Sequence, residues 1–333
     1  MNHSDKNLKL AGLFAGVGGI ELGFSQAGFS PVIANEIDIR ASETYRINHH
    51  HELITKDIND LHALDLPKFE VLTGGFPCQA FSVAGYQKGF KDPRGNVFWE
   101  IIRLIEHHEP NVVFLENVKN LGSHDSGKTL RIIREALEQN GYHVKAKVLN
   151  SNKYGGVPQN RERIYIVGFK RKKHFGNFDF PAELKKKPEL NLFIDFDKEV
   201  APEFYYEDRY MYPKLLKSMK SKETVYQWRR QYVRENKSGE CPTLTANMGT
   251  GGHNVPLVLT DYGIRKLTPR ECFNLMGFPK SFKLPNGMAN SHLYKQAGNA
   301  VVVPVIRRIA ENILASIHDE PLPSRGNTPT LFD

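Results

Sequence analysis

The chain has 333 residues and a net charge of +8, with 45 Lys and Arg against 37 Asp and Glu. This length is enough for one large α/β domain with an insertion or for two lobes. The three cysteines, Cys78, Cys241 and Cys272, are too few and too scattered for a disulfide framework or a zinc site, so no metal is expected. No run is long enough to span a membrane, and the N-terminus lacks the apolar core of a signal peptide, so we expect a cytoplasmic protein.

Strand and helix patterns alternate along the first half of the chain. An apolar strand at 8–14 leads into a glycine-rich turn and a helix pattern from Ile20, and a second strand at 31–36 precedes a helix at 41–48 and a polar turn that carries Asp57. The alternation continues at 70–75, 97–107, 111–118, 129–140, 144–150 and 163–169. Alternation of this kind predicts a mainly parallel, doubly wound α/β sheet of the Rossmann-like type.

The pattern changes after Lys170. Residues 170–237 carry 17 basic and 11 acidic side chains, which suits either a solvated surface or a face for a polyanion such as DNA or RNA. Aromatic residues supply a small core there, so we expect a second, smaller lobe of irregular loops and short strands. A capped helix near Thr268 and a turn from Tyr294 that leads into a long amphipathic helix follow. The tail from Asp319 has three prolines and is expected to be unordered.

Polar residues and glycines fall at predicted strand ends, where ligands bind in such sheets. The three glycines of the loop 14–19, here called the glycine loop, let a ligand approach the backbone. Glu36, about 20 residues downstream, suits a ribose hydroxyl pair. A structural turn and a solvated carboxylate remain the alternatives. The glycine spacing fits GxGxxG poorly, which disfavours a nicotinamide dehydrogenase. Asp57, Cys78 and Glu116 also fall at strand ends, so all of these residues are expected to share one crevice.

Cys78 lies in the turn GGFPCQAFS after an apolar run. Pro77 fixes its own φ and favours an extended residue before it, so the thiol is held at a strand-to-loop junction. The cysteine is either a buried apolar residue or a nucleophile. Arg161 and Arg163, in QNRER, are either a surface pair or guanidinium forks for an active site. The histidines 49–51 are expected at a solvated helix end, because their spacing suits no metal geometry.

The ordered motifs FAGVGG, NE at 35–36, GGFPCQAFS, ENV at 116–118, QNRERIYIVG, LTPRECFNLMGFP and QAGNAVVVPV resemble those of the DNA cytosine-5 methyltransferases. The resemblance is closest to the compact bacterial restriction-modification enzymes of the HhaI type. It covers residues 9–170 and 264–316, and the unmatched part falls where the family keeps its variable target-recognition region.

The resemblance implies covalent catalysis on cytosine. A thiolate, that of Cys78, adds to carbon 6 so that carbon 5 becomes nucleophilic enough to take a methyl group. Glu116 then binds ring nitrogen 3 and the exocyclic amine, Arg163 binds the base carbonyl, and Arg161 supports the cysteine loop. Because stacked DNA hides these atoms, the base must be flipped out.

The resemblance also implies S-adenosylmethionine as the cofactor. The glycine loop, Glu36 on the ribose and Asp57 on the adenine amine would form most of its site. Ile37 stands where the family often has Trp, so adenine stacking becomes an aliphatic contact. The full set of expected cofactor residues is Phe14, Ala15, Gly16, Gly18, Gly19, Glu36, Ile37, Asp57, Ile58, Pro77, Val97, Asn299 and Ala300.

Double-stranded DNA is the partner that the resemblance implies. The closing loop at 79–98 carries Ala84 where the closest relatives have a serine that enters the DNA stack, which puts that detail of base flipping in doubt. Threonine and glycine residues of the variable region resemble the loop that approaches the major groove. The expected DNA-binding residues are Gln79, Ser82, Ala84, Thr243, Thr245, Asn247, Gly251, Gly252 and His253.

We therefore expect a catalytic and cofactor-binding domain at 1–170, a target-recognition domain at 171–263, a return to the catalytic domain at 264–318 and a disordered tail at 319–333. The expected protein is a bacterial, monomeric, sequence-specific methyltransferase that protects DNA from a cognate restriction endonuclease. The alternatives are the tRNA-methylating branch of the same superfamily and a catalytically idle DNA- or cofactor-binding module.

Overall fold

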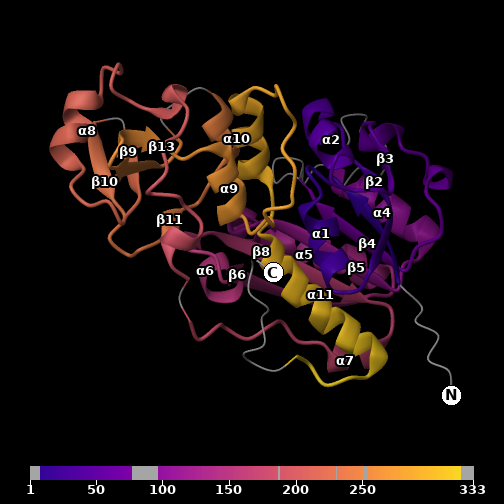
Figure 1. Ribbon diagram of the computed structural model, residues 1–333. Coiled ribbons are helices and arrows are strands. Elements are labelled where there is room, and N and C mark those ends of the chain that lie inside the picture. Colours follow the sequence, from indigo (N-terminus) through magenta and orange to yellow (C-terminus); the bar gives the residue numbers. More distant parts are fainter. Residues whose placement is uncertain (1–7, 77–96, 187, 230, 251–253, 324–333) are drawn as a thin grey trace. The chain divides into compact units, whose positions relative to one another are not determined.

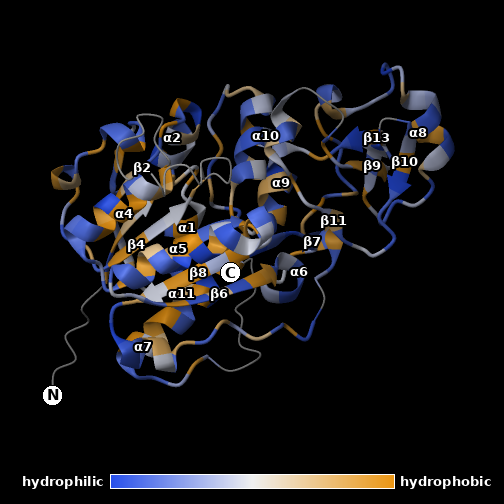
Figure 2. Cartoon of the chain, turned by 180° about the vertical axis from the view of Figure 1, so that it is seen from behind, coloured by the Kyte–Doolittle hydropathy of each residue, from blue (hydrophilic) through white to orange (hydrophobic). Residues whose placement is uncertain are grey.

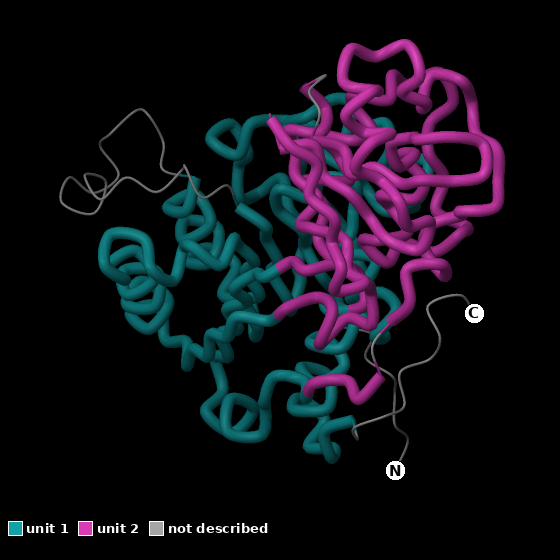
Figure 3. The backbone as a smooth tube through the Cα atoms, turned by 90° about the vertical axis from the view of Figure 1, so that its left-hand side faces the viewer, with its two compact units in different colours: residues 1–149, 162–182, 305–327 teal, residues 150–161, 183–304, 328–333 magenta. Residues whose placement is uncertain are grey.

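The computed structural model (Figure 1) describes residues 8–76, 97–186, 188–229, 231–250 and 254–323. The chain divides into two compact units (Figure 3): unit 1 comprises residues 1–149, 162–182 and 305–327, and unit 2 comprises 150–161, 183–304 and 328–333. Residues 264–304, expected to return to the first domain, belong to unit 2. The catalytic and target-recognition domains stay predictions.

Unit 1 is built on a seven-stranded sheet with the order β3-β2-β1-β4-β5-β8-β6. Its strands are β1 (Lys9–Leu13), β2 (Ser30–Asn35), β3 (Glu52–Ile54), β4 (Val71–Gly75), β5 (Val112–Val118), β6 (His143–Asn150) and β8 (Glu162–Phe169). The pairs from β3 through β5 are parallel, whereas β8 runs antiparallel to β5. The predicted mainly parallel α/β sheet is confirmed, and β3 is a strand where only a polar turn was expected.

The helices of unit 1 follow the predicted alternation. They are α1 (Gly19–Gln26), α2 (Ile39–Arg46), α4 (Val97–His108), α5 (Lys128–Gln139), α7 (Lys172–Asn177) and α11 (Val303–His318), with short 3-10 turns η1 (Ile58–Asp60), η2 (Ala63–Asp65), η5 (Lys119–Gly122) and η6 (His124–Gly127). Helix α2 begins earlier than predicted because the side chain of Asp38 accepts hydrogen bonds from the amides of Arg40 and Ala41 and caps it.

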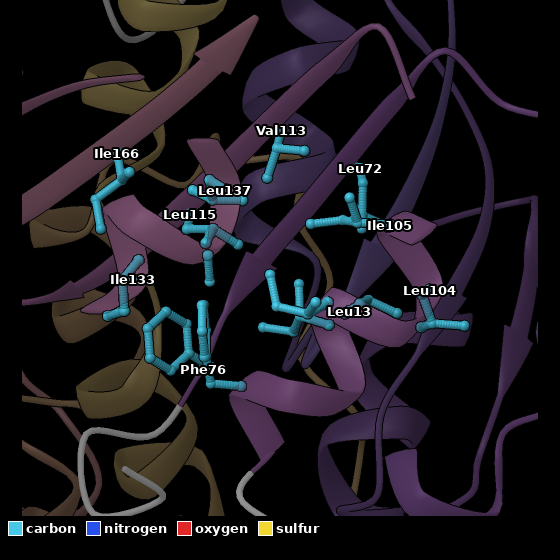
Figure 4. Packing of buried hydrophobic residues seen from close by; sticks show 14 of the residues in the cluster. Leu13, Leu72, Phe76, Leu104, Ile105, Val113, Leu115, Ile133, Leu137 and Ile166 are labelled. Carbon is cyan, nitrogen blue, oxygen red and sulfur yellow. The ribbon is translucent and has the colours of Figure 1, made fainter. Parts of the chain in front are cut away.

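Helices cover both faces of the sheet. Val113 and Leu115 of β5 pack with Leu137 of α5 and with residues of α4 in one buried cluster (Figure 4). Phe114 points to the opposite face, where its ring contacts that of Phe24 in α1 with centroids 5.2 Å apart. Figure 2 shows hydrophobic and hydrophilic residues on α4 and α5, as expected for helices that cover a sheet. This burial explains why the strands are near-continuous apolar runs.

Unit 2 contains a four-stranded antiparallel sheet with the order β10-β9-β12-β13. Its strands are β9 (Tyr226–Arg229), β10 (Tyr232–Glu235), β12 (Leu257–Thr260) and β13 (Gly263–Lys266), and β7 (Gln159–Asn160) pairs with β11 (Cys241–Pro242). Its helices and turns are α6 (Ser151–Tyr154), α8 (Tyr212–Ser218), α9 (Pro269–Leu275), α10 (Asn290–Asn299), η7 (Leu190–Leu192), η8 (Pro202–Phe204) and η9 (Ala246–Thr250). Aromatic residues do form its core, with Tyr226 and Trp228 packed against Met211 and Leu215. The smaller, separate sheet agrees with the predicted second lobe.

One helix prediction in unit 2 is confirmed and one is wrong. Thr268 caps α9 through a capping box with Glu271, as the sequence predicted. Helix α10, however, occupies 290–299, where a turn from Tyr294 was expected. Its Gly298 lies so close to the backbone of Thr245 that a Cβ there would approach the carbonyl carbon to 2.1 Å. Close packing therefore makes glycine necessary in this helix, although glycine lowers helix propensity.

Within the described ranges no helix is long and apolar enough to cross a membrane. The same residues contain no cluster of His, Cys, Asp and Glu arranged to hold a metal ion.

Candidate active site

The predicted strand-end residues that the structure describes lie at one edge of the unit 1 sheet. Strands β1, β2, β3, β4 and β5 are parallel, so their carboxyl ends meet at the same edge. The glycine loop follows β1, Glu36 follows β2, Asp57 follows β3 and Glu116 lies near the end of β5. These described residues therefore lie at one edge of the sheet, and the expectation that they share one crevice with Cys78 stays a prediction.

The glycine loop has a backbone that ordinary residues rarely adopt. Gly16 and Gly18 have φ values of +56° and +87°, and Phe14 has a φ of +54° although it has a side chain. Among the described residues, apart from its chain neighbours, no atom lies within 4 Å of the position that a Cβ on Gly16 would take. The main chain is therefore open there to a bound ligand, as expected for a binding loop.

Glu36 joins the glycine loop to the turn after β2. Its Oε2 accepts a hydrogen bond from the amide of Gly16 at 2.7 Å, and its Oε1 accepts one from the amide of Asp38 at 2.7 Å. The residue is only 9% exposed. The alternative that it is a solvated carboxylate is therefore excluded, and the side chain is fixed beside the loop.

Three further predicted cofactor positions, Ile37, Asp57 and Ile58, differ in exposure. Asp57 caps η1 by accepting hydrogen bonds from the amide and side chain of Asn59, at 2.9 and 2.7 Å, while Ile58 is buried. Ile37 is 58% exposed, which leaves a large apolar side chain at the surface beside Glu36. A single exposed apolar side chain is ordinary at a protein surface, so a contact of Ile37 with the adenine ring stays a prediction.

Glu116 and Arg163 form an ion pair between neighbouring strands. Arg163 Nε lies 3.2 Å from Glu116 Oε1, and both side chains are largely buried. The pair arises because β5 and β8 run antiparallel, with Arg163 opposite Val118. A buried carboxylate beside a guanidinium offers a planar polar molecule both an acceptor and donors.

Asn117 connects this pair to the segment that carries the cysteine. Its Nδ2 donates a hydrogen bond to the carbonyl of Phe76 at 2.8 Å, and it is 2% exposed. Gly75, next to Phe76, pairs with Glu116 across β4 and β5. The chain therefore enters the cysteine segment beside the Glu116 carboxylate. Asn117 was not predicted as a site residue, although its place next to Glu116 in ENV was a usable signal.

The segment itself is not described. The predicted residues Pro77, Cys78, Gln79, Ser82 and Ala84 lie outside the described residues, and so do Gly251, Gly252 and His253. Cys241 and Cys272, by contrast, are buried free thiols whose pKa values burial raises above the ordinary range. Both are inert at neutral pH.

Arg161 donates to the main chain of unit 2. Its guanidinium, 2% exposed, donates hydrogen bonds to the carbonyls of Leu244 at 2.6 Å, Gly298 at 3.0 Å and Ala300 at 2.7 Å. These hydrogen bonds join the segment 243–245, which carries the predicted DNA-binding threonines, to the segment 298–300, which carries the predicted cofactor residues Asn299 and Ala300. Its expected role toward the Cys78 loop concerns residues outside the described part and stays a prediction.

The remaining predicted cofactor residues are Val97, at the start of α4 and half-buried, Asn299, exposed at the end of α10, and Ala300, buried. Ala15, in the glycine loop, and Gly19, the first residue of α1, are both buried.

Of the predicted DNA-binding residues, Thr243, Thr245 and Asn247 are described. The hydroxyl of Thr243 donates to the carbonyl of Asn160 at 2.6 Å, and the carbonyl of Asn247 accepts from Thr250 at 2.7 Å. Thr243 and Thr245 line a polar cavity of ≈ 750 Å³ in unit 2.

The same cavity contains polar residues that the sequence did not single out. Gln227, Arg229 and Arg234 come from the hairpin of β9 and β10, and Arg229 donates to Gln227 Oε1 at 3.1 Å. Arg and Gln are the side chains that read guanine and adenine edges in the major groove. In the sequence, Gln227 and Arg229 alternate with the aromatic residues Tyr226 and Trp228, and this period-two pattern was the signal that could have indicated a strand with one polar face.

The histidines 49–51, expected at a solvated helix end, follow the end of α2, where His50 is exposed but His49 and His51 are half-buried. The rings of His49 and His51 both pack against Tyr45, and Tyr45 itself is fully buried. Burial lowers the pKa of His49 to about 4. Helix α2 ends at Arg46, and the chain then turns back over its own last turn, with the amide of His49 bonded to the Tyr45 carbonyl at 3.0 Å.

Glu21 is a buried carboxyl group that the sequence did not single out. It is 1% exposed, and neither carboxyl oxygen has a hydrogen-bond partner in the described part of the chain. Burial raises its pKa to about 8, because it outweighs the lowering by the residue's own backbone amide, and Glu36 adds a smaller rise. The group is therefore mostly protonated at neutral pH.

Sequence comparison adds a family match to this geometry. The family model for C-5 cytosine-specific DNA methylase matches residues 8–315. The Type II methyltransferase M.Bsp6I of Bacillus sp. (strain RFL6) is 58% identical over 314 residues, which cover 93% of this chain and 99% of that protein. M.HaeII of Haemophilus aegyptius is 40% identical, with 94% and 95% covered. M.HhaI of Haemophilus parahaemolyticus is 36% identical, with 94% and 96% covered.

Solved structures support the fold. A mutant of Spodoptera frugiperda DNMT2 superposes with a TM-score of 0.72 at 19% identity, and the match covers 92% of this chain and 99% of that one. A DNA modification methyltransferase encoded within an E. coli prophage gives a TM-score of 0.67 at 22% identity, with 93% and 99% covered.

Proposed function

The chain belongs to the C-5 cytosine-specific DNA methylase family, and on that premise we propose how this DNA cytosine-5 methyltransferase of a Type II restriction-modification system works. Cys78 is the nucleophile, Glu116 and Arg163 hold the cytosine, and S-adenosylmethionine is the methyl donor. The observation that carries the proposal is the buried Glu116–Arg163 pair, which lies beside the point where the chain enters the Cys78 segment.

Glu116 and Arg163 present complementary groups to one edge of a cytosine. The carboxyl group of Glu116 binds ring nitrogen 3 and the exocyclic amine, and the guanidinium of Arg163 donates to the carbonyl oxygen at ring position 2. Charge builds up on the ring when a thiolate adds to it. A proton held at nitrogen 3 by Glu116 offsets that charge, so these residues stabilise the adduct more than the free base.

The Cys78 sulfur forms a bond to carbon 6 as the double bond between carbons 5 and 6 opens. The electron pair released at carbon 5 would then take the methyl group, whose bond to the sulfur of S-adenosylmethionine would break so that S-adenosylhomocysteine leaves. Carbon 5 next loses its proton to a base, and the electron pair of that C–H bond restores the ring double bond as the bond to sulfur breaks. Cys78 leaves as the thiolate, and 5-methylcytosine remains.

S-adenosylmethionine, when bound, supplies an activated methyl group. The residues described fit it, because the main chain at Gly16 is open to a ligand and Glu36 lies beside that opening. Glu36 accepts one backbone hydrogen bond at each oxygen, and an ionised carboxylate has about four acceptor sites, so acceptor sites remain for ribose hydroxyls. Asp57 would accept a hydrogen bond from the adenine amine, and Ile37 would offer an apolar contact for the adenine ring.

The substrate is double-stranded DNA. The polar cavity of unit 2, lined by Arg229, Arg234, Thr243 and Thr245, has the side chains that read base edges. The basic segment 170–237 favours the phosphate backbone. The biological role that follows is protection of DNA from a cognate endonuclease, by a monomer in the bacterial cytoplasm.

A covalent trap tests the role of Cys78. Fluorine at carbon 5 of cytosine cannot leave as the proton does, so the step that expels the thiolate stalls after methyl transfer. We expect the wild-type protein, with S-adenosylmethionine, to form a denaturation-resistant complex with duplex DNA in which all cytosines carry 5-fluorine. The Cys78→Ala variant should form none. A stable complex in that variant, or no complex with a wild-type protein that methylates ordinary DNA, contradicts the proposal.

A further inference from the structure

The ring of His49 lies directly against the glycine loop. A Cβ on Gly18 would stand 2.0 Å from Nε2 of His49 and 2.6 Å from its Cδ2, so the imidazole fills the space that a side chain at position 18 would need. Gly18 has a φ of +87°, which side chains also disfavour. The loop and the ring are therefore fitted to each other.

A hydrogen bond fixes the orientation of the ring. Nε2 of His49 lies 3.3 Å from the carbonyl oxygen of Val17. A carbonyl can only accept, so Nε2 carries the proton and donates it. Because burial lowers the pKa of His49 to about 4, the imidazole is neutral at neutral pH and brings no charge to the loop.

The far side of the ring is fixed as well. The His49 ring packs against that of Tyr45, with centroids 4.3 Å apart and planes tilted by 31°. The Tyr45 hydroxyl is hydrogen-bonded to Nε2 of His51, and Tyr45 is fully buried. The ring is thus held between the core of unit 1 and the backbone at Val17 and Gly18.

We propose that His49 is a positioning residue for S-adenosylmethionine. Its ring contacts the backbone at Val17 and Gly18 and so holds the glycine loop in the conformation that binds the cofactor. This inference rests on the proposed use of that cofactor. His49 acts on the loop and not on the cofactor, since its ring contacts the loop backbone on one side and Tyr45 on the other. Its loss should therefore weaken cofactor binding and leave the chemical step largely unchanged.

The test measures the dissociation constants of S-adenosylmethionine and of its product S-adenosylhomocysteine by calorimetry, with the full chain. His49→Ala removes the donor and the packing, so we expect both affinities to fall about tenfold. His49→Gln places an amide N–H near the position of Nε2 and should restore affinity to within about threefold of wild type. His50→Ala, at the exposed neighbour, is the matched control and should change neither value.

Two further readouts separate positioning from a general loss of structure. DNA affinity, and kcat at saturating cofactor, should stay within about twofold of wild type in His49→Ala, so that the change appears in KM for the cofactor. Wild-type affinity retained by a folded His49→Ala variant overturns the inference, and so does failure of His49→Gln to recover affinity. If the wild-type protein binds neither ligand, the proposed cofactor itself is wrong, which is a different outcome.

Discussion

Replacing Glu21 with Gln should stabilise the protein increasingly as the pH rises. Glu21 is 1% exposed with no partner for either carboxyl oxygen among the described residues, and burial raises its pKa from 4.5 to about 8. In the folded state the group stays protonated up to about pH 8, whereas in the unfolded state it ionises near pH 4.5. The raised pKa therefore contributes its full stabilisation of the folded state below pH 4.5, and this contribution to the unfolding free energy is lost as the pH rises toward 8.

The magnitude follows from the size of the shift. Each pH unit in this window costs about 1.4 kcal/mol of unfolding free energy. Glutamine has the size and polarity of the protonated acid and does not titrate. The advantage of Glu21→Gln over wild type should therefore grow by about 2 kcal/mol between pH 6 and pH 8.

The assay is urea unfolding of both proteins at pH 6 and pH 8, which yields the difference in unfolding free energy at each pH. Groups shared by the two proteins cancel in this comparison. Glu52→Gln, which removes an exposed carboxyl group from β3, is the matched control for the loss of one acidic side chain. If the Glu21→Gln difference is the same at both values, Glu21 ionises normally and the account of a buried unpaired carboxyl is refuted.

Three further predictions concern packing, cofactor and target. Gly298→Ala should lower the unfolding free energy by about 1–3 kcal/mol in urea unfolding, because its Cβ would stand 2.1 Å from the Thr245 backbone. The control Gly176→Ala, with open space around it among the described residues, should cost no stability. Equal unfolding free energies for the two variants would contradict the packing of α10. Glu36→Gln should weaken S-adenosylmethionine binding about tenfold by calorimetry, and an unchanged affinity would remove its ribose role. Arg234→Ala should widen the set of DNA sequences methylated, as read by bisulfite sequencing, whereas Lys237→Ala should lower activity without changing the set. The idea fails if both variants keep the wild-type pattern.

The sheet was predictable because its strands are buried on both faces. Apolar runs such as Val112–Leu115 have no reading other than a covered strand or helix, and their alternation with amphipathic segments fixes the class. Strand β3, only three residues long, has no periodicity of its own. It is held by pairing with β2 and by Asn35, whose side chain donates to the carbonyls of Ile54 and Lys56 at 3.1 and 3.0 Å.

Helix α10 was missed for a related reason. Its sequence contains glycine and asparagine, which favour turns. The helix forms because tertiary contacts outweigh propensity: Tyr294 donates to the carbonyl of Leu267 at 2.6 Å, and Gly298 lets the backbone of Thr245 come close. Neither contact leaves a signal in the local pattern.

Some site residues could be predicted from the sequence and others could not. Glu36, Asp57 and Glu116 were predictable because a strand-end position can be read from local sequence. The supporting residues were not, since each acts across a long sequence separation. Asn117 bonds Phe76, and His49 packs beneath a loop 31 residues earlier, so only the folded chain shows what they support.

The most direct test of the central claim is transfer of labelled methyl from S-adenosylmethionine to unmodified plasmid DNA, followed by bisulfite sequencing of the product. We expect label in DNA and protected cytosines at one short recurring sequence. Label in tRNA but not DNA, or protection scattered without a common sequence, would contradict a sequence-specific DNA cytosine-5 methyltransferase.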